Sequence, residues 1–572
     1  MSETINLGGG EALARMLDAQ GARRTFGMGG FQLLPYYDAL SRGAGPSHVL
    51  IKDERDGAFM ADAYARVTNT PGVCDGTLGP GVTNLITGLA ESYGAGVPVI
   101  AIAGEVNSMI AGRGATQESA QLAMVAPTVK EAIRVDRIER VPELVRHAYA
   151  VATAGRPGPV LLNVAEDVTH GSFDFPLDDL TPDPAVGELP GRRTRGDSDD
   201  VDAVATLLAE AERPLLLVGG GIHLSAGYEE LQALVERFDL PVATTISGKG
   251  AISERHPLAV GVFGRYSRIA NDLLAAADAL VVVGCKLGEI ATNRWSLLPA
   301  GVRVAQIDVD PTTIGRNVRA EVGVWADAKL ALADLAAALA DRPESDRAAY
   351  LAEIDDRCAA WLEEHEARRN AADQPIHQAR MLLELNRAIP EDGVLVADGG
   401  FAAHWSALYW ETPRAGRHYI ANRGHASIGY GLPGALGAAL GADGRKVVGL
   451  VGDGGLGMSI GELETAVRLG SDIVIVVVDN QASGYVKALQ HALFEDRFQS
   501  VDCVPVDYAA VAAEFGLHAE RVEDPALLGG AFERAFATPG PALVDVVVTR
   551  DPAGMLPAAD PRTRSREKQA AV

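Results

Sequence analysis

The segment from residue 447 to residue 485 constrains the fold of this 572-residue chain most strongly. It opens with an apolar run, Val447–Val451, and continues as Gly-Asp-Gly-Gly through Asp453. Apolar residues at helical spacing follow, and a turn leads into a β-branched run, Ile473–Val478, that ends just before Asn480. The pattern predicts a strand, a helix and a second, parallel strand. Asp453 and Asn480 would then lie at neighbouring carboxyl ends, where open α/β sheets bind ligands.

The residue types at these strand ends suit a diphosphate that is held through a metal ion. Gly454 and Gly455 have no side chains, so their N–H groups can approach phosphate oxygens at the start of the next helix. The carboxylate of Asp453, the amide oxygen of Asn480 and the backbone carbonyl of Ala482 are oxygen ligands of the kind that Mg²⁺ prefers. We therefore expect a magnesium diphosphate site here.

The full arrangement is far more specific than a lone Gly-Asp-Gly, which is usually only a turn. With 26 residues between Asp453 and Asn480, it resembles the thiamine diphosphate (ThDP) motif of the superfamily that includes acetolactate synthase, pyruvate decarboxylase and benzoylformate decarboxylase. The alternative is an ordinary αβ unit. The resemblance implies ThDP and Mg²⁺ as cofactors, with Asp453, Asn480 and Ala482 as metal ligands and Gly454, Gly455 and Tyr485 in contact with ThDP.

Composition narrows the class of protein. The formal net charge of −25 argues against nucleic acid and anionic membranes as partners. The four cysteines are scattered without metal-ligand spacing, which favours reduced, structural thiols. The first seven residues lack a secretion signal, and no run of 18 apolar residues occurs. We expect a cytoplasmic enzyme that acts on small molecules.

Two polar stretches divide the chain. Residues 178–200 are rich in Pro, Gly, Asp and Arg and are typical of a linker. Residues 341–374 are charged and include a predicted helix over 358–369. The expected domains are therefore 1–177, 200–340 and 375–552, followed by a polar tail.

The first and third blocks look related. Residues 150–164 and 531–546 each contain a helix end, a Pro-Gly-Pro turn and an apolar strand. The superfamily contains two such related domains with a third between them. The resemblance thus implies an α/β protein with three doubly wound domains and mainly parallel sheets: a pyrimidine-binding domain, a central Rossmann-like domain and a diphosphate-binding domain.

The first block contains the residue expected to activate the cofactor. A short strand ends near Ile51, and a helix is predicted over Asp56–Arg66. In the resembling enzymes, a glutamate between these elements bonds the pyrimidine ring nitrogen N1′, and the match places Glu54 in that role. The alternative is an acid that complements the helix dipole, for which Asp53 or Asp56 is better placed. Gln117 matches a site glutamine of acetolactate synthases.

The middle block begins like a Rossmann domain, with a strand at Pro214–Val218 and three glycines after it. In acetolactate synthases this domain binds FAD. Here Gly284-Cys285-Lys286-Leu287-Gly288-Glu289 replaces the flavin motif of that family, which puts FAD in doubt. Bound flavin and a structural domain both remain open.

The third block supplies further residues by resemblance. Gly400 and Phe401 lie in a loop that resembles a diphosphate-contacting one. The segment from Ala426 to Pro433 matches a family segment in which an apolar residue, here Ile428, wedges between the two cofactor rings. The backbone of Ala426 and Ile428 would bond the pyrimidine edge. His425 is the favoured acid/base among the nearby histidines, although a lone histidine is more often simply solvated.

The resemblance implies a ThDP- and Mg²⁺-dependent enzyme, a transferase or lyase, that acts on a 2-oxo acid through an enamine. Decarboxylases of this superfamily commonly place a glutamate six residues after the metal-binding Asn, whereas this chain has Val486 there. His48 and His147 lie outside the segments expected to form the site. A pocket poor in proton donors favours carboligation with a carbonyl acceptor. Simple decarboxylation to an aldehyde, an aldehyde lyase or acyltransferase, a flavin-linked oxidase and an inactive binding subunit stay open. A homodimer or homotetramer is expected.

Overall fold

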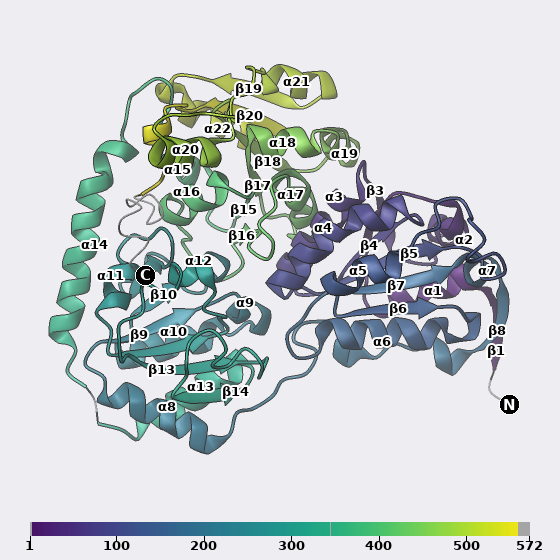
Figure 1. The fold of residues 1–572 in the computed structure, drawn as a ribbon, viewed down its shortest axis with the longest axis horizontal. Helices are drawn as coiled ribbons and strands as arrows, with labels where there is room; N and C mark the ends of the chain where they lie inside the picture. Colours follow the sequence, from purple (N-terminus) through teal and green to yellow (C-terminus); the bar gives the residue numbers. More distant parts are fainter. Residues whose placement is uncertain (1–2, 344, 559–572) are drawn as a thin grey trace. The chain divides into compact units, whose positions relative to one another are not determined.

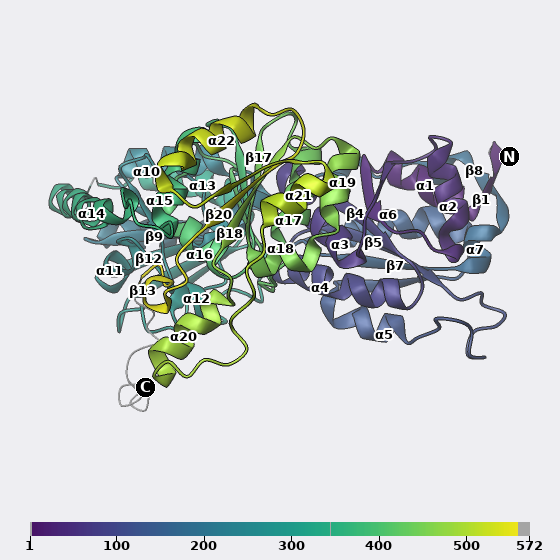
Figure 2. The same ribbon diagram turned by 90° about the horizontal axis from the view of Figure 1, so that it is seen from above.

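The computed structural model describes residues 3–343 and 345–558, so most of the expected polar tail lies outside the described residues. The chain forms two compact units. The first contains the chain up to Arg192 together with Asn422–Val447 and Ser459–Ile473. The second contains Arg193–Ala421, Val448–Met458 and the chain from Val474 onward. Figure 1 shows the ribbon coloured along the sequence, and Figure 2 shows it from a second direction.

The N-terminal block forms a parallel six-stranded sheet in the order β3-β2-β4-β5-β7-β6. Strands β4, β5 and β7 are buried along their whole length, as is usual for parallel strands that are covered on both faces. A separate antiparallel pair, β1 with β8, joins the two ends of the block. The strands are β1 (Thr4–Gly8), β2 (Arg24–Gly27), β3 (Ser47–Leu50), β4 (Gly72–Gly76), β5 (Val99–Glu105), β6 (Glu131–Val135), β7 (Val160–Ala165) and β8 (Ser172–Pro176).

Helices complete the first unit. α1, α2 and α6 share a core with β5 and β7, in which Leu13 and Leu144 pack with Ile100. α17, although distant in sequence, lies against α3, and a Cβ at Gly437 would be only 2.1 Å from the Met60 carbonyl oxygen. The helices are α1 (Gly9–Ala19), α2 (Leu34–Ser41), α3 (Glu54–Thr68), α4 (Pro80–Ala95), α5 (Gln121–Val125), α6 (Val141–Thr153), α7 (Glu166–His170), α17 (Gly431–Gly441) and α19 (Glu462–Leu469).

The central sheet has the parallel order β11-β10-β9-β12-β13-β14, which is the Rossmann order expected for this block. Alternate residues of β9 face opposite cores: Leu216 packs with α8, α10 and α13, and Leu217 packs with α11 and α14. The strands are β9 (Pro214–Val218), β10 (Val242–Thr244), β11 (Ala259–Val262), β12 (Ala279–Val283), β13 (Arg303–Asp308) and β14 (Val322–Trp325). The helices are α8 (Ser198–Glu210), α9 (Gly221–Ser225), α10 (Tyr228–Phe238), α11 (Ala270–Ala275), α12 (Glu289–Thr292), α13 (Ala328–Ala340) and α14 (Ala348–Arg369).

The third sheet has the order β16-β15-β17-β18-β20-β19, which is the same winding as the N-terminal sheet. The two Pro-Gly-Pro turns precede equivalent strands, β7 and β20, so the relation read from the sequence extends to topology. Three doubly wound parts with parallel sheets confirm the expected fold class. The remaining strands are β15 (Val394–Ala397), β16 (Tyr419–Ala421), β17 (Val447–Gly452), β18 (Ile473–Asp479), β19 (His518–Val522) and β20 (Ala542–Val547). The remaining helices are α15 (Gln378–Ala388), α16 (Phe401–Tyr409), α18 (Asp453–Ser459), α20 (Gly484–Phe494), α21 (Tyr508–Phe515) and α22 (Leu528–Ala537).

Two predicted helices begin earlier than expected. α3 starts at Glu54, because the Asp53 side chain accepts the Arg55 N–H at 2.9 Å and caps the helix. α14 starts at Ala348, ten residues before the predicted start at Cys358, and buries Tyr350 and Ile354 against the central sheet. Within the described ranges, no helix combines the length and the apolar character that a bilayer span requires.

Candidate active site

Three adjacent strands of the C-terminal sheet end at residues singled out from the sequence. Gly400, with φ of 69°, follows β15 and precedes α16. Asp453 directly follows β17 and begins α18, while Asn480 directly follows β18. Because the carboxyl ends of parallel strands meet at one edge, the fold brings these three residues to the same edge of the sheet.

Asp453 is a buried carboxylate that lacks a cationic partner. Its side chain is buried, and among the described residues no Lys, Arg or His lies within ion-pair distance of it. Burial raises the pKa of Asp453 to about 6, while the backbone N–H groups of Gly454, Gln481 and Ala482 favour the charged form. Buried carboxylates are normally paired or bound to metal, so this group fits a divalent cation.

The other expected metal ligands surround this carboxylate. Asn480 is also buried, and its Oδ1 accepts the Ala482 N–H at 3.1 Å while keeping a second lone pair. In the described ranges, no cluster of three or more His, Cys, Asp or Glu side chains could hold a metal ion. A metal at this edge would therefore combine one carboxylate with amide and carbonyl oxygens, as the sequence motif predicted.

The space beside these ligands suits a diphosphate. A Cβ added at Gly454 would meet nothing within 4 Å, so open room lies in front of the first turn of α18. Gly455, the next residue, is buried. Phe401 and Tyr485 lie in the same unit and contact one another edge to face, with ring centroids 5.3 Å apart. Predicted ThDP contacts from three segments thus share one edge.

Glu54, the predicted activating carboxylate, belongs to the first unit and is 2% exposed. Asn84 Nδ2 donates to Glu54 Oε2 at 3.0 Å, which fixes the carboxylate. A Cβ at Gly81 would lie 2.9 Å from Glu54 Oε1, so a glycine is needed there. The other carboxylate oxygen thus faces the glycine-containing first turn of α4.

Gln117 adjoins the same turn. A Cβ at Gly79, whose φ is 71°, would lie 2.3 Å from the Gln117 carbonyl oxygen. Gln117 itself has a φ of 65°, and it is exposed. The sequence missed Gln121, whose buried side chain accepts the Gly79 N–H at 2.9 Å and holds the turn in place.

The loop from residue 422 to residue 428 lies in the first unit as well. Ala426 has a φ of 59°, a conformation that non-glycine residues seldom adopt. His425 is exposed, and the Ile428 side chain is 46% exposed although it is aliphatic. The structure therefore places the predicted wedge and the predicted acid/base in the same compact unit as Glu54.

A buried polar cluster in this unit escaped the sequence analysis. Asp75 accepts hydrogen bonds from the Tyr37 hydroxyl and from Thr25 Oγ1, the latter at 3.0 Å. His48 Nε2 lies 3.2 Å from Asp75 Oδ2. A Cβ at Gly29 would lie 3.3 Å from the Tyr37 ring. His48 therefore belongs to a group beside the glycines that follow β2, a role that the sequence did not indicate. A charged residue inside an apolar strand was the available signal.

In the central block, the glycines that follow β9 pack against the loop that follows β12. A Cβ at Gly219 would lie 2.2 Å from the Gly284 carbonyl oxygen, and one at Gly221 would lie 2.7 Å from the Gly284 Cα. Close packing of two loops therefore accounts for these glycines without a nucleotide.

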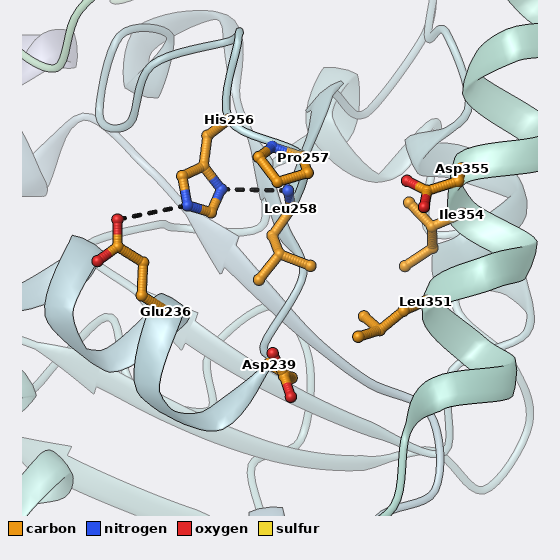
Figure 3. A pocket seen from close by; sticks show the side chains of 8 residues that line it. All are labelled: Glu236, Asp239, His256, Pro257, Leu258, Leu351, Ile354 and Asp355. Carbon is orange, nitrogen blue, oxygen red and sulfur yellow. Dashed lines mark hydrogen bonds and ion pairs between the residues drawn. The ribbon is translucent and has the colours of Figure 1, made fainter.

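A pocket of about 290 Å³ also lies in the central block (Figure 3). It opens beside the residues that precede β10 and β11, which is the amino edge of the sheet rather than the edge where such folds bind ligands. It is lined by Glu236, Asp239, His256, Pro257, Leu258, Leu351, Ile354 and Asp355. The pocket is therefore no candidate for a dinucleotide site.

Comparison with known families decides between the superfamily and an ordinary αβ unit. Three family models of thiamine pyrophosphate enzymes match the chain in order: the N-terminal TPP binding domain over residues 7–124, the central domain over 201–335, and the C-terminal TPP binding domain over 398–546. The chain belongs to the thiamine pyrophosphate enzyme family. It is accordingly a ThDP-dependent enzyme, as the motif predicted.

Curated relatives match this family member along almost their whole length. The chain is 34% identical over 573 residues to the probable acetolactate synthase large subunit of Methanocaldococcus jannaschii, covering 97% of this chain and 94% of the relative. It is 29% identical over 544 residues to the acetolactate synthase isozyme 2 large subunit of Escherichia coli, covering 95% and 96%. It is therefore similar to acetolactate synthase large subunits.

Proposed function

We propose that this enzyme uses ThDP and Mg²⁺ to join a 2-oxo acid, with loss of carbon dioxide, to a carbonyl acceptor. The observation that carries the proposal is the meeting of Asp453 and Asn480 at adjacent strand ends. The first is a buried carboxylate with no Lys, Arg or His of the described residues within ion-pair distance, and the second is a buried amide. The names of the relatives support acetolactate synthase-like chemistry. Blocks 1–177, 200–340 and 375–552 would be the three domains.

On the diphosphate side, the chain supplies ligands and room. Asp453, Asn480 and the Ala482 carbonyl would hold Mg²⁺, and the N–H groups of Gly454 and Gly455 would bond phosphate oxygens. The remaining contacts with ThDP would come from Gly400, Phe401 and Tyr485. A metal ion bound there would keep Asp453 ionised and so offset the burial that raises its pKa to about 6.

On the pyrimidine side, Glu54 would hold the proton at ring nitrogen N1′, with Asn84 keeping the carboxylate in place. When bound, ThDP supplies the nucleophilic carbon and the electron sink that decarboxylation needs. Ile428 would enforce the bent cofactor shape, because its aliphatic side chain remains exposed in an otherwise restrained loop. Gln117 would contact the substrate side of the site.

A product screen tests the reaction. The protein is reconstituted with ThDP and Mg²⁺ and supplied with a panel of 2-oxo acids, with and without aldehyde acceptors. We expect a carboligation product whenever an acceptor is present. Aldehyde as the sole product across the panel would establish simple decarboxylation instead, which His425 supports because it is exposed beside the wedge residue.

The flavin-linked oxidase and the inactive binding subunit each have a simple test. A flavin-linked oxidase requires bound FAD, and a colourless purified protein would count against it. An inactive binding subunit would turn over no 2-oxo acid. Glu54, Asp453 and Asn480 together argue for activity, because a binding subunit has no need of the activating carboxylate.

We also propose a homo-oligomer in which Glu54 and Asp453 of one active site come from different chains. Mixing inactive Glu54→Gln protein with inactive Asp453→Ala protein should then restore activity, up to roughly a quarter of the wild-type level if chains pair at random. Full activity in a strictly monomeric species by light scattering would contradict this assembly. Several relatives are named large subunits, so a second, smaller chain is a further partner to seek by copurification.

A further inference from the structure

The backbone of residues 424–426 is held by a side chain to which neither the sequence motifs nor the proposed mechanism assigns a role. Glu91, fully buried in α4, accepts the N–H groups of Gly424 at 2.8 Å, His425 at 2.6 Å and Ala426 at 3.1 Å. All of these residues lie in the first unit. One carboxylate thus binds three consecutive amides of the loop.

Glu91 accepts a fourth hydrogen bond, from Arg66. Arg66 Nη2 lies 3.0 Å from Glu91 Oε1, and the Arg66 guanidinium is itself 2.7 Å from Asp62 Oδ1. A carboxylate has about four lone-pair positions, and here each oxygen receives two donors. Burial by itself would lower the pKa of Arg66, but the adjacent carboxylates outweigh it and raise that pKa above its ordinary value. Glu91 therefore accepts hydrogen bonds at all four positions, and a group that donates could not take its place.

Close backbone contact shows that this attachment is part of the fold. A Cβ at Gly424 would lie 2.0 Å from the Glu91 carbonyl oxygen, and a Cβ at Gly94 would lie 2.4 Å from the Gly424 carbonyl oxygen. The loop thus rests directly on α4. Beyond the wedge, the Ser459 hydroxyl donates to the Gly429 carbonyl at 2.8 Å, so the loop is held on both sides of Ile428.

We propose that Glu91 is a positioning residue for the cofactor: its three amide bonds hold Ala426 in the left-handed conformation and so fix the Ala426 carbonyl and Ile428. The inference rests on the proposed function, which assigns the ring wedge to Ile428, and on the family resemblance, which assigns the Ala426 carbonyl to the pyrimidine edge. A non-glycine residue at a φ of 59° persists only where its surroundings impose it, and the Glu91 contacts supply that restraint.

The first test is amide hydrogen exchange on the full-length protein without cofactor. Although His425 is exposed, the amides of residues 424–426 should exchange slowly in the wild type. In Glu91→Gln they should exchange at least about tenfold faster, because the new –NH₂ group faces donors instead of accepting from them. If these amides of the wild-type protein exchanged as fast as those of an unprotected loop, the proposal would be overturned. This outcome can be measured without any variant.

The second test is calorimetric titration with ThDP and Mg²⁺. We expect Glu91→Gln to bind ThDP at least about tenfold more weakly. Glu254→Gln is the matched control, because the Glu254 side chain is only 6% exposed and pairs with Lys249 at 2.5 Å, but in the second unit. The control should leave both exchange at 424–426 and ThDP affinity unchanged.

The outcomes separate this inference from the proposed function. Faster exchange in Glu91→Gln with unchanged ThDP affinity and unchanged turnover would overturn the positioning role. A wild-type protein that protects residues 424–426 but fails to bind ThDP would instead refute the proposed function. Equal loss of affinity in the Glu254→Gln control would show that general destabilisation, not the loop, was responsible, and would also overturn the inference.

Discussion

Replacing Asp56 by Asn tests whether a buried carboxyl group of the first unit is protonated near neutral pH. Asp56 is 1% exposed and lies in the first turn of α3. The Ser459 hydroxyl is 3.0 Å from Asp56 Oδ1 and 2.8 Å from the Gly429 carbonyl oxygen. One hydroxyl hydrogen cannot serve both acceptors. A protonated Asp56 resolves the conflict by donating to Ser459, which then donates to Gly429.

The surroundings of Asp56 also favour its protonated form. Burial raises the pKa of Asp56 to about 8. The positive charge of Arg55, whose Nε is 3.4 Å from Asp56 Oδ1, lowers this pKa, and the negative charge of Glu462 raises it. In the unfolded chain, Asp titrates near a pH of about 4. Between about pH 4 and pH 8 the folded state therefore binds one more proton at Asp56, and each rise in pH lowers the free energy of unfolding by about 1.4 kcal/mol per unit.

The asparagine variant removes this dependence, because its amide is neutral at every pH and can still donate to Ser459. A change of about 1 kcal/mol shifts the melting temperature of a domain of this size by about 2–4 °C. As the pH rises from about 5 to 8, the wild-type protein should lose stability through Asp56 and the variant should not. The melting temperature of Asp56→Asn should therefore gain about 3–5 °C on that of the wild type for each pH unit.

Scanning calorimetry of both proteins at each pH measures this difference, following the transition of the first unit. Asp53→Asn is the matched control at the same helix end, because it alters a half-exposed capping group but keeps the buried Asp56, so its melting temperature should still fall with rising pH as that of the wild type does. Parallel curves for Asp56→Asn and the wild type would refute the argument, since they would mean that Asp56 is ionised in the folded protein.

Three further predictions concern catalysis. Glu54→Gln should keep its fold and bind ThDP, because the Gln carbonyl can still accept from Asn84, but turnover should fall by at least about 10²-fold in a steady-state assay; near-wild-type turnover would remove Glu54 from the mechanism. Asp453→Ala should abolish Mg²⁺-dependent ThDP binding in calorimetric titration, whereas the surface variant Asp472→Ala should bind normally; unchanged affinity in Asp453→Ala would exclude the metal site. His425→Ala should leave the carboligation product intact in chromatographic analysis, and loss of an aldehyde product in this variant would instead identify His425 as the proton donor.

The fold could be predicted because its signals are local or recur along the chain. Apolar β-branched runs such as Ile473–Val478 specify buried parallel strands, and β18 extends over Ile473–Asp479. The repeated Pro-Gly-Pro turn predicted two related sheets, and their strand orders are the same. Helix starts were less predictable, since the capping role of Asp53 depends on one side-chain hydrogen bond.

Some residues of the candidate site could also be predicted from the sequence, and others could not. Asp453 and Asn480 follow strands directly, so their convergence comes from parallel winding alone. Glu91 could not be found, because its partners in the 424–426 loop are more than 300 residues away in sequence. Asp75 was visible only as an acid inside an apolar strand, a pattern that does not say which distant groups will satisfy it.

The cluster around Asp75 bears on whether a proton or a carbonyl carbon completes the reaction. The Tyr37 hydroxyl donates to Asp75, and burial followed by the Asp75 charge raises the pKa of Tyr37 far above its ordinary value, so this tyrosine holds its proton tightly. His48 directs Nε2 at the same carboxylate, 3.2 Å away. These groups satisfy one another and support the glycines after β2 through the contact of Tyr37 with the Gly29 position. A tyrosine that holds its proton tightly does not supply it to the site, which supports the proposed capture of the enamine by a carbonyl acceptor.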